Sequence, residues 1–279
     1  MTKFEIIGKH INYPNMKRLI PFLIIIFSLS NAYGQSARQY AKAGKEFVEA
    51  KNYKDALVQY TKAINLDPKK TDFYLQRAMI FEKLGNIDSA FVDITRALVF
   101  DDEIDTRVEA ARLSLLLKNY DEALKQCDAA LTKKRSCNEA FEIKTKTLIE
   151  QQEYYKAKMV SDEALQNKET AVNFYLNAVI LENLGNLESS EKSYRKAISK
   201  DKKLEEAYVG LSNLLVKLNK FNEAMEQCQT LLKMNPDNVD AYIARSKVYV
   251  KLQDFPNAIV PRFQSLGSVV DGCWFGEVA

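Results

Sequence analysis

The sequence predicts an all-α solenoid in which antiparallel helix pairs are stacked along the chain. Its main basis is a small residue that recurs every 33 or 34 positions. The seven residues are Ala56, Ala90, Ala123, Ala157, Ser190, Ala224 and Ala258. A fixed period of this length is typical of one supersecondary unit that is repeated and stacked, with each copy burying its apolar face against its neighbours. Such an architecture favours a binding surface over a catalytic pocket.

The small residues define the second helix of each unit. In the first unit, Tyr53 lies three positions before Ala56, and Ala63 lies seven positions after it. Positions separated by three, four and seven residues share one face of a helix. The later units keep this phase, so each second helix carries a stripe of small residues that lets another helix approach closely.

The first helix of each unit is marked by large apolar residues seven positions apart, such as Tyr40 and Phe47. Short polar pairs such as Lys51-Asn52 and Gly85-Asn86 separate it from the second helix. Glycine and asparagine suit a left-handed helix end and the cap of the helix that follows. We therefore expect pairs of roughly 14-residue helices, each pair joined by a tight turn.

The first unit resembles a tetratricopeptide repeat. The matching residues are Tyr40, Gly44, Phe47, Tyr53, Ala56, Tyr60, Ala63 and Pro68. The resemblance covers six full repeats and the start of a seventh, so we assign residues 35–258 to the array. It implies a right-handed superhelix whose first helices line a concave groove. Ser161 and Cys228 occupy positions where the motif prefers a large aromatic residue, and we expect looser packing there.

The resemblance also implies that the groove binds a protein or peptide. Ten first-helix residues are the predicted contacts: Lys45, Leu75, Met79, Arg112, Glu142, Lys146, Tyr175, Val179, Glu182 and Asn213. Tyr175 is expected to be an exposed aromatic anchor near the centre. Repeats that clamp chaperone C-termini carry a Lys and an Asn one helical turn apart in their first unit. Here these positions hold Ala41 and Lys45, which does not favour that ligand.

The N-terminal residues 1–34 contain a predicted secretory signal peptide, from about Met16 to Gly34. Lys17-Arg18 precede an apolar run, and small residues follow it before Gln35. This order is typical of a cleaved signal. A membrane anchor is the alternative, but the run is too short to span ~30 Å of hydrocarbon. We expect an exported protein, periplasmic or secreted and of bacterial type, with no stable membrane span after cleavage.

The repeat phase is lost in residues 259–279, which we expect to form an irregular tail. Pro261 falls inside the predicted last helix, where proline is strongly unfavourable, and three glycines follow. The tail is either a native end or the result of a truncation. These alternatives give two functions: a scaffold or adaptor in an envelope or secreted assembly, or the sensory or docking region of a longer protein.

Charge and composition argue against several other functions. The net charge is +3, and the predicted signal region holds a basic surplus of three, so the remainder is close to neutral and no nucleic-acid partner is expected. His10, the only histidine, lies in that region, which removes the usual general base. We therefore predict no catalysis, no metal, no cofactor and no small-molecule substrate. Whether Cys127 and Cys137 form a disulfide is left open.

Overall fold

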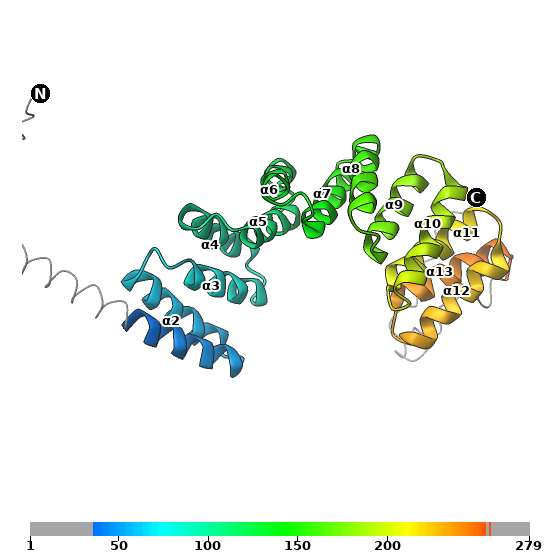
Figure 1. The fold of residues 1–279 in the computed structure, drawn as a ribbon. Helices are drawn as coiled ribbons and strands as arrows, with labels where there is room; N and C mark the ends of the chain where they lie inside the picture. Colours follow the sequence, from blue (N-terminus) through cyan, green and yellow to red (C-terminus); the bar gives the residue numbers. More distant parts are fainter. Residues whose placement is uncertain (1–35, 255–256, 258–279) are drawn as a thin grey trace, which may run out of the picture. The chain divides into compact units, whose positions relative to one another are not determined.

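The structure is a computed structural model that describes residues 36–254 and residue 257 (Figure 1). The predicted signal peptide, Ala258 and the predicted tail lie outside the described residues. Within them every regular element is an α-helix, which confirms the all-α prediction. The chain divides into two compact units, the first ending at Leu117 and the second beginning at Lys118. This boundary falls between the two helices of the third predicted pair.

From residue 36 onward, unit 1 contains a helical stretch over residues 36–49 and four further helices. They are α2 (Tyr53–Leu66), α3 (Thr71–Lys83), α4 (Ile87–Phe100) and α5 (Ile104–Leu116). Helix α3 packs against both α2 and α4, and α4 packs against α5. Each helix therefore buries its apolar face against its neighbours in the sequence.

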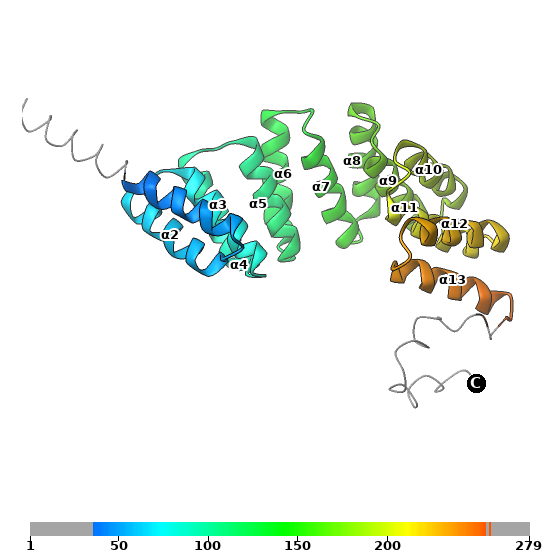
Figure 2. The same cartoon turned by 90° about the horizontal axis from the view of Figure 1, so that it is seen from below.

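The described part of unit 2 contains eight helices that follow the same pattern. They are α6 (Tyr120–Lys133), α7 (Asn138–Glu150), α8 (Tyr154–Asn167), α9 (Ala171–Asn183), α10 (Leu187–Lys200), α11 (Glu205–Lys217), α12 (Phe221–Met234) and α13 (Val239–Lys251). Neighbouring helices in the sequence pack together, and α11 also contacts α9 and α13 (Figure 2). The first helices α9, α11 and α13 therefore form one continuous layer within unit 2.

The small-residue stripe lies in the core, as the sequence predicts. The six described members of the 34-residue series have no exposed surface. Ser190 shows how a polar member is accommodated, because its hydroxyl donates to the carbonyl of Ala178 on the preceding helix at 2.8 Å. A larger side chain at these positions would push the paired helices apart, because protein interiors are already close-packed.

The turns between paired helices have the predicted left-handed residue. Gly85 and Gly185 have φ values of +76° and +79°, and Asn219 has +58°. Asn86 then caps α4, because its side-chain oxygen accepts a hydrogen bond from the Ser89 N–H at 3.1 Å. The other described turns place Lys or Gln in the same conformation, so the chain keeps the turn geometry even where the residue is unfavourable.

Ser161 is buried at the position where the motif prefers an aromatic ring, and a polar chain occupies the space around it. The Asn177 side chain donates to the Ser161 hydroxyl at 3.2 Å and accepts from the Ser193 hydroxyl at 3.0 Å. These hydrogen bonds join α8, α9 and α10.

The cysteines Cys127, Cys137 and Cys228 are all buried, and each has a free thiol. The structure therefore contains no Cys127–Cys137 disulfide.

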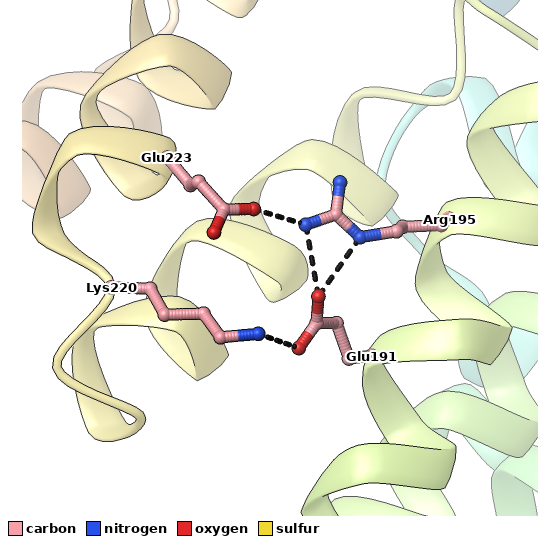
Figure 3. A network of polar contacts seen from close by, with 4 residues as sticks. All are labelled: Glu191, Arg195, Lys220 and Glu223. Carbon is pink, nitrogen blue, oxygen red and sulfur yellow. Dashed lines mark hydrogen bonds and ion pairs between the residues drawn. The ribbon is translucent and has the colours of Figure 1, made fainter.

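Charged residues tie α10 to the start of α12 (Figure 3). The Glu191 carboxylate accepts from Lys220 Nζ at 2.8 Å and from Arg195 Nη2 at 2.9 Å. Arg195 Nη2 also contacts Glu223 Oε2 at 2.5 Å. The four side chains therefore alternate in charge across two second helices.

Candidate functional site

A hollow of about 680 Å³ lies on the first-helix layer of unit 2. We call it the unit 2 hollow. It is lined by Tyr175 and Glu182 from α9, Tyr194 from α10, Glu205, Glu206, Val209, Gly210, Asn213, Val216 and Lys217 from α11, the α13 cap Asn238, and Asp240 and Lys247 from α13. Most of the lining residues come from α9, α11 and α13, which are the first helices of three successive repeats. The hollow is therefore a product of stacking, and no single repeat contains it.

Two tyrosines and a glycine form the hydrophobic part of the unit 2 hollow. The rings of Tyr175 and Tyr194 are tilted at 52°, with centroids 6.2 Å apart. Tyr194 is almost fully buried, and a Cβ added to Gly210 would lie only 2.4 Å from its ring. Glycine at this point of α11 therefore lets the ring lie against the helix backbone.

Glu182 holds the far end of the Tyr194 side chain. Its carboxylate accepts from the Tyr194 hydroxyl at 3.0 Å and from Lys217 Nζ at 2.6 Å. Burial, and then the nearby Glu182 charge, raise the pKa of Tyr194 well above its usual range. The tyrosine is consequently neutral over the physiological range and acts as a hydrogen-bond donor.

The two lysines in the wall differ in how their charge is balanced. Lys217 pairs with the Glu182 carboxylate, whereas Lys247 Nζ donates to the neutral side-chain oxygen of Asn213 at 3.1 Å. Both contacts join helices of successive repeats. They fix the C-terminal ends of α9, α11 and α13 relative to one another.

The N-terminal ends of α11 and α13 make the opposite side of the hollow acidic. Glu205 accepts hydrogen bonds from the side-chain amides of Asn235 and Asn238, at 3.1 Å and 2.6 Å. Both donors are neutral amides, so neither of these contacts is an ion pair. Glu206 and Asp240 are exposed, and neither forms an ion pair with another described residue.

Three of the ten predicted contacts, Tyr175, Glu182 and Asn213, line the unit 2 hollow together. Tyr175 is half-buried, which corrects the expectation of an exposed anchor, because its ring packs against Tyr194 and the core beneath α9. Val179 is also half-buried and packs against the same core. Tyr175 is thus part of the wall, with only one side open to a ligand.

Leu75, Met79 and Arg112 line a separate hollow of about 430 Å³ in unit 1. Arg112 Nη2 contacts Glu82 Oε2 at 2.6 Å, and its guanidinium also binds Glu109. These two carboxylates raise the pKa of Arg112. Its charge is already neutralised, so the open part of this hollow is mainly apolar.

The other predicted contacts, Lys45, Glu142 and Lys146, line neither hollow. Lys45 is exposed and lies 4.0 Å from Glu49 in the same helix. Glu142 accepts a hydrogen bond from the Asn138 side chain at 2.7 Å, while burial raises its pKa. Lys146 is exposed on α7.

Residues missed by the sequence analysis include Tyr194, Glu205, Gly210 and Lys217. Tyr194 lies four positions after Ser190 in a second helix, whereas all ten predicted contacts lie in first helices. The Gly210–Tyr194 contact joins successive repeats, whereas Gly44 and Tyr60 make their contact within the first repeat, so the repeat motif did not predict it. Lys217 and Glu182 lie 35 positions apart, close to one repeat length.

The described residues contain no group of histidine, cysteine and carboxylate side chains that could hold a metal ion. Across the same part of the chain, no helix combines the length and apolar character required to cross a membrane.

Two family profiles match the chain: one described as TPR repeat at residues 44–85, and one described as Tetratricopeptide repeat at residues 181–248. These two segments of the chain are tetratricopeptide repeats. A tetratricopeptide repeat protein of Parabacteroides merdae has a similar structure, with a TM-score of 0.71 at 20% identity, over 84% of this chain and 94% of that one. This similarity supports the fold that the repeat phase predicts.

Curated relatives of this repeat chain include longer proteins. The Hsp70-Hsp90 organizing protein of Triticum aestivum is 24% identical over 243 residues, which is 80% of this chain and 39% of the wheat protein. Tetratricopeptide repeat protein 4 of Bos taurus is 31% identical over 112 residues, covering 38% of this chain and 29% of the bovine protein. The tetratricopeptide repeats described here thus span well under half the length of either relative.

Proposed function

We propose that this chain is a non-catalytic scaffold or adaptor that binds a segment of a partner protein in the unit 2 hollow. The observation that carries the proposal is the hollow itself, which is lined by two tyrosines, by Val209 and Val216 of α11, and by several charged groups. Recognition of an extended or helical segment needs such a combination, because apolar contacts supply affinity and charged groups fix the register. The wheat relative, which is named as an organizer of two other proteins, supports a protein-binding role.

Photo-cross-linking tests this proposal in the native host. A photoreactive amino acid replaces Asn213 inside the hollow, and in a control it replaces Gln229, which is exposed on α12. Position 213 should capture a discrete partner, and position 229 should not. The captured protein is then purified and titrated against the repeat chain by calorimetry.

The titration uses a matched pair of variants. Asn213→Arg places a long charged side chain inside the hollow and should weaken binding of the purified partner by ~1–3 kcal/mol, the range typical of a central interface contact. Gln229→Arg adds the same side chain outside the hollow and should leave binding unchanged. Equal affinity of both variants and the unmodified chain, with helicity retained in each, would refute the proposed site.

We further propose that the chain acts outside the cytoplasm, in an envelope or secreted assembly of a bacterium. The supporting observation is the charged, apolar and small-residue order from Lys17 to Gly34. Intact-mass measurement of the protein from its native host should give a chain that begins at or near Gln35. A full-length chain in the cytosolic fraction would contradict the proposal.

A further inference from the structure

At one end of the unit 2 hollow, the charged residues that line it are all acidic. Glu206 and Asp240 occupy the first turns of α11 and α13, and Glu205 lies beside them. All three line the hollow. At the other end, Lys217 already pairs with Glu182, so only Lys247 keeps an unbalanced positive charge. The uncompensated charge of the wall is therefore negative and concentrated at the N-terminal ends of two helices.

Local helix chemistry accounts for only part of this arrangement. An acidic residue in the first turn complements the partial positive charge of a helix N-terminus. Glu188 has this role at the start of α10, and Asp121 has it at the start of α6, and neither lines the hollow. At α11 and α13, by contrast, the carboxylates line a shared hollow together with the half-buried side chains of Tyr175 and Val209.

We propose that the segment held in the unit 2 hollow carries a basic side chain, Lys or Arg, next to an apolar residue. This inference rests on the proposed function. The basic group contacts Glu206 and Asp240, with Glu205 close by, while the apolar residue contacts Tyr175 and Val209. The acidic end of the hollow, formed by Glu205, Glu206 and Asp240, attracts a basic partner and repels an acidic one. These residues therefore set specificity and association rate.

Three sets of synthetic nonapeptides test this assignment on the full chain. All are acetylated and amidated, and all have a central Leu-Tyr pair; the flanking positions are Lys and Arg in one set, Glu and Asp in the second, and Ser and Gln in the third. Fluorescence anisotropy measures Kd at low salt. The basic set should bind about ten-fold more tightly than the neutral set, and added salt should reduce that advantage because exposed charges are screened.

Charge reversal locates the effect. The double variant Glu206→Lys with Asp240→Lys should remove the advantage of the basic set and favour the acidic set. The control, Glu188→Lys with Asp121→Lys, changes two first-turn acids outside the hollow and should leave the preference intact. Circular dichroism checks that both double variants keep the helicity of the unmodified chain.

Each outcome bears on one claim. If the neutral or acidic peptides bind as well as the basic ones, and Asn213→Arg still blocks them, the basic assignment is wrong and the scaffold proposal stands. The basic peptides could also bind most tightly while both double variants change their Kd equally. Glu206 and Asp240 would then not be the contact, and the assignment would also be overturned. If the purified cross-linked partner is bound without any effect of Asn213→Arg, the scaffold proposal itself is refuted.

Discussion

Single residues decide the geometry of the turns between paired helices. A residue with a side chain loses stability in the left-handed region, because its Cβ approaches the following carbonyl oxygen, and glycine avoids this cost. Gly185 has φ of +79°, and the space around its Cα is open, so a new Cβ there would meet no neighbour. Backbone strain is thus the only obstacle to substitution.

We therefore expect Gly185→Ala to lower the free energy of unfolding by ~1–2 kcal/mol. The matched variant Gln152→Gly changes the equivalent turn in the other direction, at φ +59°, and should raise the midpoint or leave it unchanged. Urea denaturation followed by circular dichroism measures both. A stabilising effect of Gly185→Ala would show that this turn is not held in the left-handed conformation.

Much of this detail could be predicted from residues alone. The Gly-Asn pairs predict both the left-handed helix end and the cap, and the structure confirms Asn86 as the cap of α4. The half-burial of Tyr175 could not be predicted, because it depends on Tyr194, which lies in the partner helix of the same repeat. A periodic pattern predicts which face of one helix is buried, whereas the exposure of a residue at the edge of that face depends on its neighbours.

At the scale of elements, the Glu191 network joins α10 and α12 on the side of unit 2 formed by second helices (Figure 3). The Lys220 ammonium and then the Arg195 guanidinium lower the pKa of Glu191 from its ordinary value of 4.5. A carboxylate whose pKa is lowered by folding stabilises the protein above its unfolded pKa. That contribution is lost as the pH falls through the folded value.

The variant Glu191→Gln should therefore lower the denaturation midpoint at pH 7, because Arg195 and Lys220 lose their shared carboxylate. The gap between the variant and the unmodified chain should narrow as the pH falls from about 4.5 through the lower pKa of folded Glu191, because below that folded-state pKa Glu191 is neutral in both states. The control Glu226→Gln alters an exposed residue of α12 outside the network. A gap that is constant with pH would show that the network contributes nothing through charge.

The order and pairing of the elements follow from the repeat phase. A small residue recurs every 33 or 34 positions on the second helices. It specifies which face of each second helix packs against a neighbouring helix, because small side chains permit close contact. The Glu182–Lys217 pair was not predicted, because the two residues are 35 positions apart and so occupy different positions in their repeats. Ion pairs between successive first helices depend on side-chain reach, which a spacing rule does not give.

At the scale of the whole molecule, the unit 2 hollow is a product of stacking. Each repeat contributes only a few side chains to it. Three residues of the groove prediction, Tyr175, Glu182 and Asn213, line one hollow. The groove prediction also named Lys45 and Lys146, which lie apart from both hollows, because a repeat rule marks the same position in every unit whether or not a hollow forms there.

The central claim is that a partner segment occupies the unit 2 hollow. An experimental structure of the repeat chain bound to its cross-linked partner tests this most directly. The account predicts partner density between Tyr175 and Asn213, with a basic side chain beside Glu206 and Asp240. Partner density confined to the outer faces of α10 and α12, with the hollow filled only by solvent, would contradict it.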